Sequence, residues 1–169
     1  IKEMNEDEFQ ELLVKLFKTM GYENVQPNCG SQEYGKDIYF IQKDKISSTS
    51  YSVVVKAGNV NMDTAHTMIK QIYNSFDIPA DTKDGKLKIQ KVIAVTNGIY
   101  KQNSNHMISN SENLASKRGY ITIWNITDVV RLCLEYIPTL VVSDQSIQLT
   151  EYKEKVNNLL SSYETLKFL

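Results

Sequence analysis

The run Val53-Val54-Val55 is the feature that most restricts how this 169-residue chain can fold. Consecutive β-branched residues favour a strand, and a strand without polar alternation is one that is buried on both faces. A sheet built around such a strand needs helices on both sides. We therefore expect a layered α/β domain with residues 51–56 as a central strand.

Amphipathic segments supply the helices that this sheet needs. Apolar residues between Phe9 and Met20 recur at three- and four-residue spacing, which predicts a helix with Asn5 as its N-cap and Gly21 at its end. A second helix is expected over residues 63–76. A third begins at Thr127, its predicted cap, and runs to about residue 136.

Shorter apolar runs predict four more strands, over residues 24–27, 37–42, 92–95 and 120–124. Residues 43–50 are expected to form a hairpin loop, and residues 79–85 another loop. The polar run 102–113 favours either a loop or the exposed side of a further helix. The order α-β-β-β-α-β-α-β-α-α predicts a mixed sheet of about five strands, covered on both faces.

The C-terminal part carries a heptad-like apolar stripe, which predicts one long helix; its members are Leu149, Tyr152, Val156, Leu159, Tyr163 and Leu166. Two interpretations stay open. The helix packs against its own domain, or it is a connector or oligomerisation helix that leads to further domains of a longer chain. We therefore separate a main domain, residues 1–137, from a loop and helix over residues 138–169.

Composition and cysteine content indicate an ordinary cytoplasmic domain. Two cysteines, Cys29 and Cys133, make neither a disulfide framework nor a zinc site, and both are expected to be small buried side chains. The chain has no apolar run of about 20 residues, so no membrane span is expected. The net charge is −1, yet residues 36–101 carry ten lysines against six acids, a local excess of +4 that either faces phosphates or is a solvated surface.

Asp37 and Lys56 form the pair that most clearly indicates chemistry. Asp37 begins one expected strand and Lys56 ends the next, so a hairpin brings both to the same end of the sheet. A carboxylate is a ligand that Mg²⁺ prefers, and a lysine beside the ion can orient an attacking water or offset transition-state charge. This pairing suits phosphodiester hydrolysis. Two structural alternatives stay open: Asp37 as a turn residue, and Lys56 as a solvated strand end.

With these motifs in this order, the sequence resembles the Mrr-like branch of the PD-(D/E)xK, or restriction-endonuclease-like, nucleases. The resemblance covers about residues 8–137, and the matching segments are the helix ending in Gly21-Tyr22, Gly35-Lys36-Asp37-Ile38, the strand ending in Lys56, Gln71-Ile72 and Val95-Thr96-Asn97-Gly98. It implies a three-layer α/β/α restriction-endonuclease-like core; the long C-terminal helix predicted from the heptad-like stripe follows that core.

The sequence departs from that family's pattern at two positions. The family usually has Glu or Gln two residues before the lysine, where this chain has Val54, and its first helix often carries Glu where this chain has Gln10. A valine side chain cannot bind a metal ion. These departures put catalysis itself in question.

The resemblance implies a role for each residue of the site. Asp37 binds Mg²⁺ or Mn²⁺ with the backbone carbonyl of Val55, as the matching carbonyl does in the family. Lys56 positions the attacking water. Apart from the resemblance, Glu11, as a carboxylate displaced along the helix, or Glu33, in the same turn as Asp37, is expected to complete the acidic shell; a solvated loop position stays open for Glu33.

The resemblance also implies a DNA substrate and a wider role. Double-stranded DNA is the expected partner, and the residues expected to grip it are Lys36, Lys43, Lys45, Lys70 and Gln71. Gln71 equally suits a place on the surface or behind the site. The expected function is a metal-dependent endonuclease, the effector part of a larger bacterial restriction or antiphage protein. The alternative is an inactive nuclease-fold module that binds nucleic acid or a protein.

Overall fold

The run Val53, Val54 and Val55 lies, as predicted, in the central strand of a five-stranded sheet. The computed structural model describes residues 1–28, 36–83, 85–101 and 103–137. Its elements, in chain order, are α1 (Glu6–Thr19), β1 (Glu23–Pro27), β2 (Ile38–Lys43), β3 (Ser48–Lys56), α2 (Met62–Asp77), β4 (Ala80–Thr82), β5 (Gly85–Leu87), β6 (Lys91–Thr96), α3 (Ser104–Asn110), the 3₁₀ helix η1 (Glu112–Tyr120), β7 (Ile121–Trp124) and α4 (Ile126–Tyr136).

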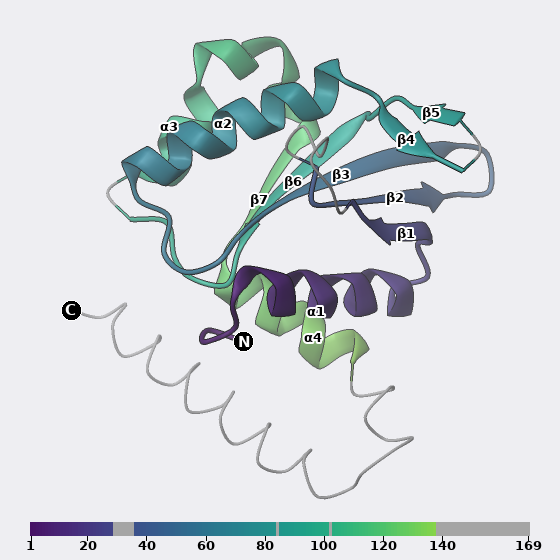
Figure 1. Ribbon diagram of the computed structural model, residues 1–169, viewed down its shortest axis with the longest axis horizontal. Coiled ribbons are helices and arrows are strands. Elements are labelled where there is room, and N and C mark those ends of the chain that lie inside the picture. Colours follow the sequence, from purple (N-terminus) through teal and green to yellow (C-terminus); the bar gives the residue numbers. More distant parts are fainter. Residues whose placement is uncertain (29–35, 84, 102, 138–169) are drawn as a thin grey trace, which may run out of the picture.

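The sheet is mixed, with strand order β1-β2-β3-β6-β7. β1, β2 and β3 pair antiparallel, whereas β3, β6 and β7 run parallel, joined by α2 and by α3 with η1. Helices α1 and α4 cover one face and α2 and α3 the other (Figure 1). This is the three-layer α/β/α architecture that the sequence predicted.

The central strand β3 contributes to both hydrophobic cores. Val53 and Val55 pack in the cluster on the side of α1 and α4, while Val54 packs in the cluster on the side of α2. All three are fully buried. Val54, which stands where the resembling family has a polar residue, is therefore a core side chain.

Helix α1 begins as predicted, at a capping box. The Asn5 side chain accepts a hydrogen bond from the backbone N–H of Glu8, and the Glu8 carboxylate accepts one from the backbone N–H of Asn5. The helix buries Phe9, Leu13 and Phe17 against the sheet. The start of α1 is thus fixed both by its cap and by its core contacts.

Two local predictions need correction, and a third left two alternatives open. Residues 79–85 were expected to be a loop, but Ala80–Thr82 and Gly85 belong to the short paired strands β4 and β5. Strands of three residues are too short to show an alternating pattern in the sequence. The cap of α4 is Asn125 rather than Thr127, because the Asn125 side chain accepts from the N–H groups of Thr127 and Asp128. The run 102–113 includes α3, so the helical alternative for this segment is the correct one.

The predicted C-terminal helix, residues 147–169, lies outside the described residues, as does Cys29. Among the helices that the structure does describe, none has the length and apolarity needed to span a bilayer.

Two turns cross closely at the ends of β3 and β6. Gly98, just after β6, packs against the backbone of Gly58, just after β3. A Cβ atom on Gly98 would overlap the Gly58 carbonyl and lie 2.7 Å from the Asn59 nitrogen. Because both contacts are with backbone, only glycine fits at position 98 without moving a loop.

We predict that Gly98→Ala lowers the free energy of unfolding by about 1–3 kcal/mol, the usual effect of overpacking. Gly119→Ala is the matched control, since a Cβ there meets nothing within 4 Å. Urea denaturation monitored by circular dichroism measures both variants. Equal stability of the two variants would show that the close crossing is not a constraint.

Cys133 is expected to be chemically inert in the native protein. Its side chain is buried in the core beside α1, and burial raises the pKa of the thiol to about 11. At pH 8 it is therefore protonated and shielded. In a Cys29→Ser variant, a disulfide-exchange reagent at pH 8 should label Cys133 only after denaturant is added; fast labelling of the native protein would contradict the burial.

Candidate active site

The carboxylate of Asp37 lies against the backbone of β3. Its Oδ2 accepts a hydrogen bond of 2.6 Å from the N–H of Val55, while the Asp37 N–H donates to the carbonyl of Val53 at 3.0 Å. β2 begins at Ile38, which pairs with Val53, so the backbone pairing between β2 and β3 does not reach Val55. The Asp37 side chain therefore takes the place of a missing strand partner and satisfies a backbone donor that would otherwise be orphaned.

The carbonyl of Val55 is directed toward the same side of the strand. In a β-strand, the N–H and C=O of one residue point to the same neighbour. Because the Val55 N–H meets Asp37, its carbonyl oxygen also faces the space beyond the start of β2. Two oxygen donors, one carboxylate and one carbonyl, are thus directed to one edge of the sheet.

Lys56 follows directly and ends β3 at the same edge. Its Nζ forms an ion pair with Oε1 of Glu6, at 3.2 Å. The Lys56 side chain is 17% exposed and that of Glu6 39%, so the pair is only partly solvated. Glu6 is the first residue of α1. The structure therefore brings the N-terminus of α1 to the Asp37–Lys56 edge.

Asn97 ties together the segments around this edge. It is fully buried, and its amide nitrogen donates to the carbonyls of Ile1 and Met4, both at 2.9 Å. Its Oδ1 accepts from the N–H of Gly58 at 2.6 Å. One side chain thus links the end of β6, the turn after Lys56 and the segment that leads into α1.

The donors at this edge fit a hard divalent cation. Mg²⁺ prefers oxygen ligands and commonly binds through one or two carboxylates while retaining several waters. The Asp37 carboxylate and the Val55 carbonyl are donors of that kind. Two protein donors leave most of the coordination of such an ion to water. Within the described ranges, no group of three His, Cys, Asp or Glu residues is placed to hold a metal ion.

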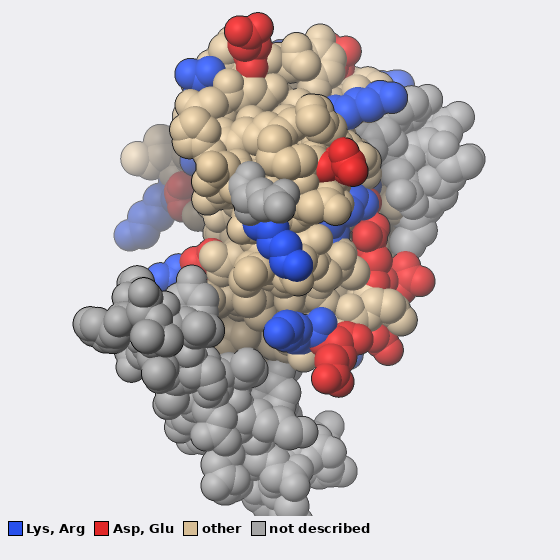
Figure 2. Space-filling model, turned by 90° about the vertical axis from the view of Figure 1, so that its left-hand side faces the viewer, with Lys and Arg blue, Asp and Glu red and all other residues tan. Residues whose placement is uncertain are grey.

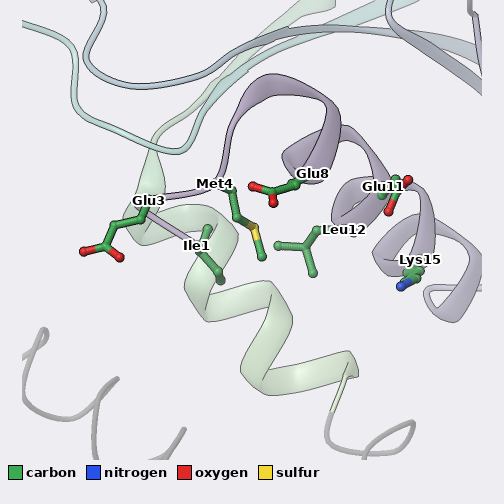
Figure 3. Close-up of a pocket in the computed structure, with 7 residues that line it drawn as sticks. All are labelled: Ile1, Glu3, Met4, Glu8, Glu11, Leu12 and Lys15. Carbon is green, nitrogen blue, oxygen red and sulfur yellow. The ribbon is translucent and has the colours of Figure 1, made fainter.

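The structure does not bring Glu11 to this edge. Glu11 is exposed and, on an ideal helix, lies about 140° round the axis from Glu6. It lines a hollow of about 450 Å³ with Ile1, Glu3, Met4, Glu8, Leu12 and Lys15. Figure 3 shows this hollow between α1, the N-terminal segment and α4. Glu33, the other predicted acid, lies outside the described residues.

Lys36 is buried, although it was predicted to grip phosphates. Only 1% of the residue is exposed. Burial lowers the pKa of Lys36 below its ordinary value, and the negative charge of Asp81 on β4 opposes that shift. The side chain is enclosed in the protein, where it cannot reach a phosphate of a docked duplex without a rearrangement.

The remaining predicted DNA contacts are spread over the surface. Lys43 and Lys45 lie at the β2–β3 turn, six and eight residues from Asp37 and thus about 20 Å or more along the strand. Lys43 pairs with Glu23 at 2.6 Å. Lys70 is exposed on α2, whereas Gln71 has a buried Oε1 that accepts no hydrogen bond from the described residues.

The face at the site end of the sheet has mixed charge. Figure 2 shows this end of the molecule: Lys and Arg side chains are scattered over it, and acidic side chains gather toward the lower right. The excess of lysines in residues 36–101 therefore does not form a single basic patch on this face.

Sequence reasoning did not identify Glu6 or Asn97 as site residues. The signal for Glu6 was its spacing, since it lies one helical turn before Gln10 and on the same side of α1. Asn97 stood in the quoted segment Val95-Thr96-Asn97-Gly98, but nothing in the sequence indicated which backbone groups it would bind.

Comparisons with known proteins identify the family. No curated protein matches the chain. Among solved structures, the DNA modification-dependent restriction endonuclease AspBHI is 10% identical, with a TM-score of 0.46; the match covers 91% of this chain and 35% of that chain. The MspJI restriction endonuclease in complex with a 27-mer oligonucleotide is 14% identical, with a TM-score of 0.42; the match covers 91% of this chain and 31% of that chain. This chain thus spans about a third of the length of each. Residues 1–133 match the family described as restriction endonuclease, Mrr_cat, and the chain belongs to that family.

Proposed function

We propose that this domain is a divalent-metal-dependent endonuclease that hydrolyses phosphodiester bonds of double-stranded DNA. The observation that carries the proposal is the 2.6 Å hydrogen bond between the Val55 N–H and the Asp37 carboxylate, because it places an acid beside the residue that precedes Lys56. Membership of a restriction endonuclease family supports DNA as the substrate.

In this proposal, each residue at the edge has one task. The Asp37 carboxylate and the Val55 carbonyl hold Mg²⁺ or Mn²⁺, which when bound supplies Lewis-acid chemistry at the scissile phosphate. The Lys56 ammonium orients the attacking water and stabilises the negative charge that develops on the phosphoryl oxygens. The low exposure of Lys56 strengthens this electrostatic effect, since less water screens it.

Lysines away from the edge would contact the duplex backbone. Lys45 and Lys70 are exposed and suit that task, and Lys43 can contribute once it leaves Glu23. In the wider proposal, the domain is the cleaving part of a larger cytoplasmic restriction or antiphage protein, in which the C-terminal segment links it to other domains or to a second copy.

A DNA- or protein-binding module without catalysis is the second candidate function. The buried Val54 and the uncharged Gln10 favour it: Val54 lacks the polar group, and Gln10 lacks the negative charge, that the resembling nucleases carry at these positions. A binding module would bind DNA with a steep salt dependence and without any dependence on Mg²⁺. Metal-dependent cleavage by the wild-type protein excludes it.

We expect Asp37→Asn to lower the rate of plasmid nicking in Mg²⁺ or Mn²⁺ by at least about 100-fold, and Lys56→Ala to do the same, as removal of a transition-state group does. The asparagine keeps an oxygen that can accept from the Val55 N–H, so the variant should fold. The protein is assayed in its assembled, full-length form, on supercoiled DNA.

Asp77→Asn, which removes an exposed acid at the end of α2, is the control for Asp37→Asn. It should cut like the wild type. A wild-type protein that never cuts in either metal, or an Asp37→Asn variant that cuts at the wild-type rate, would overturn the proposed function.

A further inference from the structure

The ion pair between Glu6 and Lys56 lies at the site, yet the proposed chemistry gives Glu6 no task. Glu6 is four residues before Gln10, so the two lie about 40° apart on an ideal helix and share one face of α1. Gln10 stands where the resembling family often has an acid. The structure thus supplies a carboxylate from the same helix face, one turn nearer to the helix start.

The backbone that carries Glu6 is held on both sides. On one side, the Asn5 capping box fixes the first turn of α1. On the other, buried Asn97 binds the carbonyls of Ile1 and Met4, and the same side chain binds the turn after Lys56 through Gly58. The two partners of the ion pair are therefore attached to one rigid junction.

We propose that Glu6 is a positioning residue that holds the Lys56 ammonium in place beside Asp37. The inference rests on the proposed nuclease function and assigns to this site an acid that the family pattern places elsewhere on the helix. A lysine side chain has many rotamers, and ordering it costs up to about 2 kcal/mol of entropy. An ion pair with a fixed carboxylate selects one of these rotamers before the substrate arrives.

The geometry favours this role over that of an inhibitory contact. A contact that must open needs a partner that can move away, whereas Glu6 lies on a capped helix anchored through Asn97. The negative charge of Glu6 is also favourable at the N-terminus of α1, where the helix dipole is positive.

The test compares Glu6→Gln with Asp7→Asn, its exposed neighbour in the same helical turn. Each variant removes one negative charge from the start of α1, but only Glu6→Gln removes the charge that faces Lys56. Plasmid nicking is measured over a range of DNA concentrations to separate kcat from KM. Thermal unfolding confirms that both variants are folded.

We expect Glu6→Gln to lower kcat about 10–100-fold, as is typical when a supporting partner of a site residue is lost. KM should stay within about twofold, since phosphate contacts are unchanged. Asp7→Asn should match the wild type, and Glu6→Asp should retain more activity than Glu6→Gln because it keeps the charge. The side-chain amine signal of Lys56, assigned by its loss in Lys56→Arg, should shift in Glu6→Gln and not in Asp7→Asn.

Two results would overturn the inference but leave the proposed function intact. In the first, the wild type cuts DNA and Glu6→Gln has the same kcat as Asp7→Asn. In the second, Glu6→Gln cuts faster than the wild type, which would mark an inhibitory contact. A wild type that does not cut overturns the proposed function and the inference with it. The failures are thus distinguishable in one set of assays.

Discussion

The hydrogen bond from the Val55 N–H to the Asp37 carboxylate is the interaction on which the site depends. It occurs because β2 begins at Ile38, opposite Val53, so that no residue of β2 pairs with Val55. The Asp37 side chain completes the ladder in place of backbone. This hydrogen bond holds the Asp37 carboxylate against Val55, the residue next to Lys56. The strand pairing that brings the two together is the same pairing that forms the core.

The rest of the fold supports this edge. Parallel pairing of β3 with β6 places Lys56 beside Thr96, so the turns that follow both strands meet at Gly58 and Gly98. Asn97 then connects these turns to the segment before α1. A helix that is distant in sequence from β3 is thereby held at the site, which is the reason its first residue can contact Lys56.

The architecture and the convergence of Asp37 and Lys56 could be predicted from the sequence, because both depend on short-range patterns. The β-branched run and the amphipathic stripes predict the architecture, and one hairpin predicts that Asp37 and Lys56 lie at the same end of the sheet. The sequence was insufficient where tertiary packing decides. Glu11 and not Glu6 was named from the sequence, because identifying Glu6 requires knowing which side of α1 faces the end of β3. The burial of Lys36 could not be predicted from alternation, because its surroundings include Asp81 of the β4–β5 hairpin, a unit too short to be recognised.

The most direct test of the central claim is a crystal structure of the protein soaked in Mn²⁺, with the ion located by its anomalous signal. The account predicts a peak within about 2.0–2.6 Å of a carboxylate oxygen of Asp37 and of the carbonyl oxygen of Val55. Mn²⁺ bound only elsewhere, with this edge of the sheet empty at saturating concentration, would contradict it.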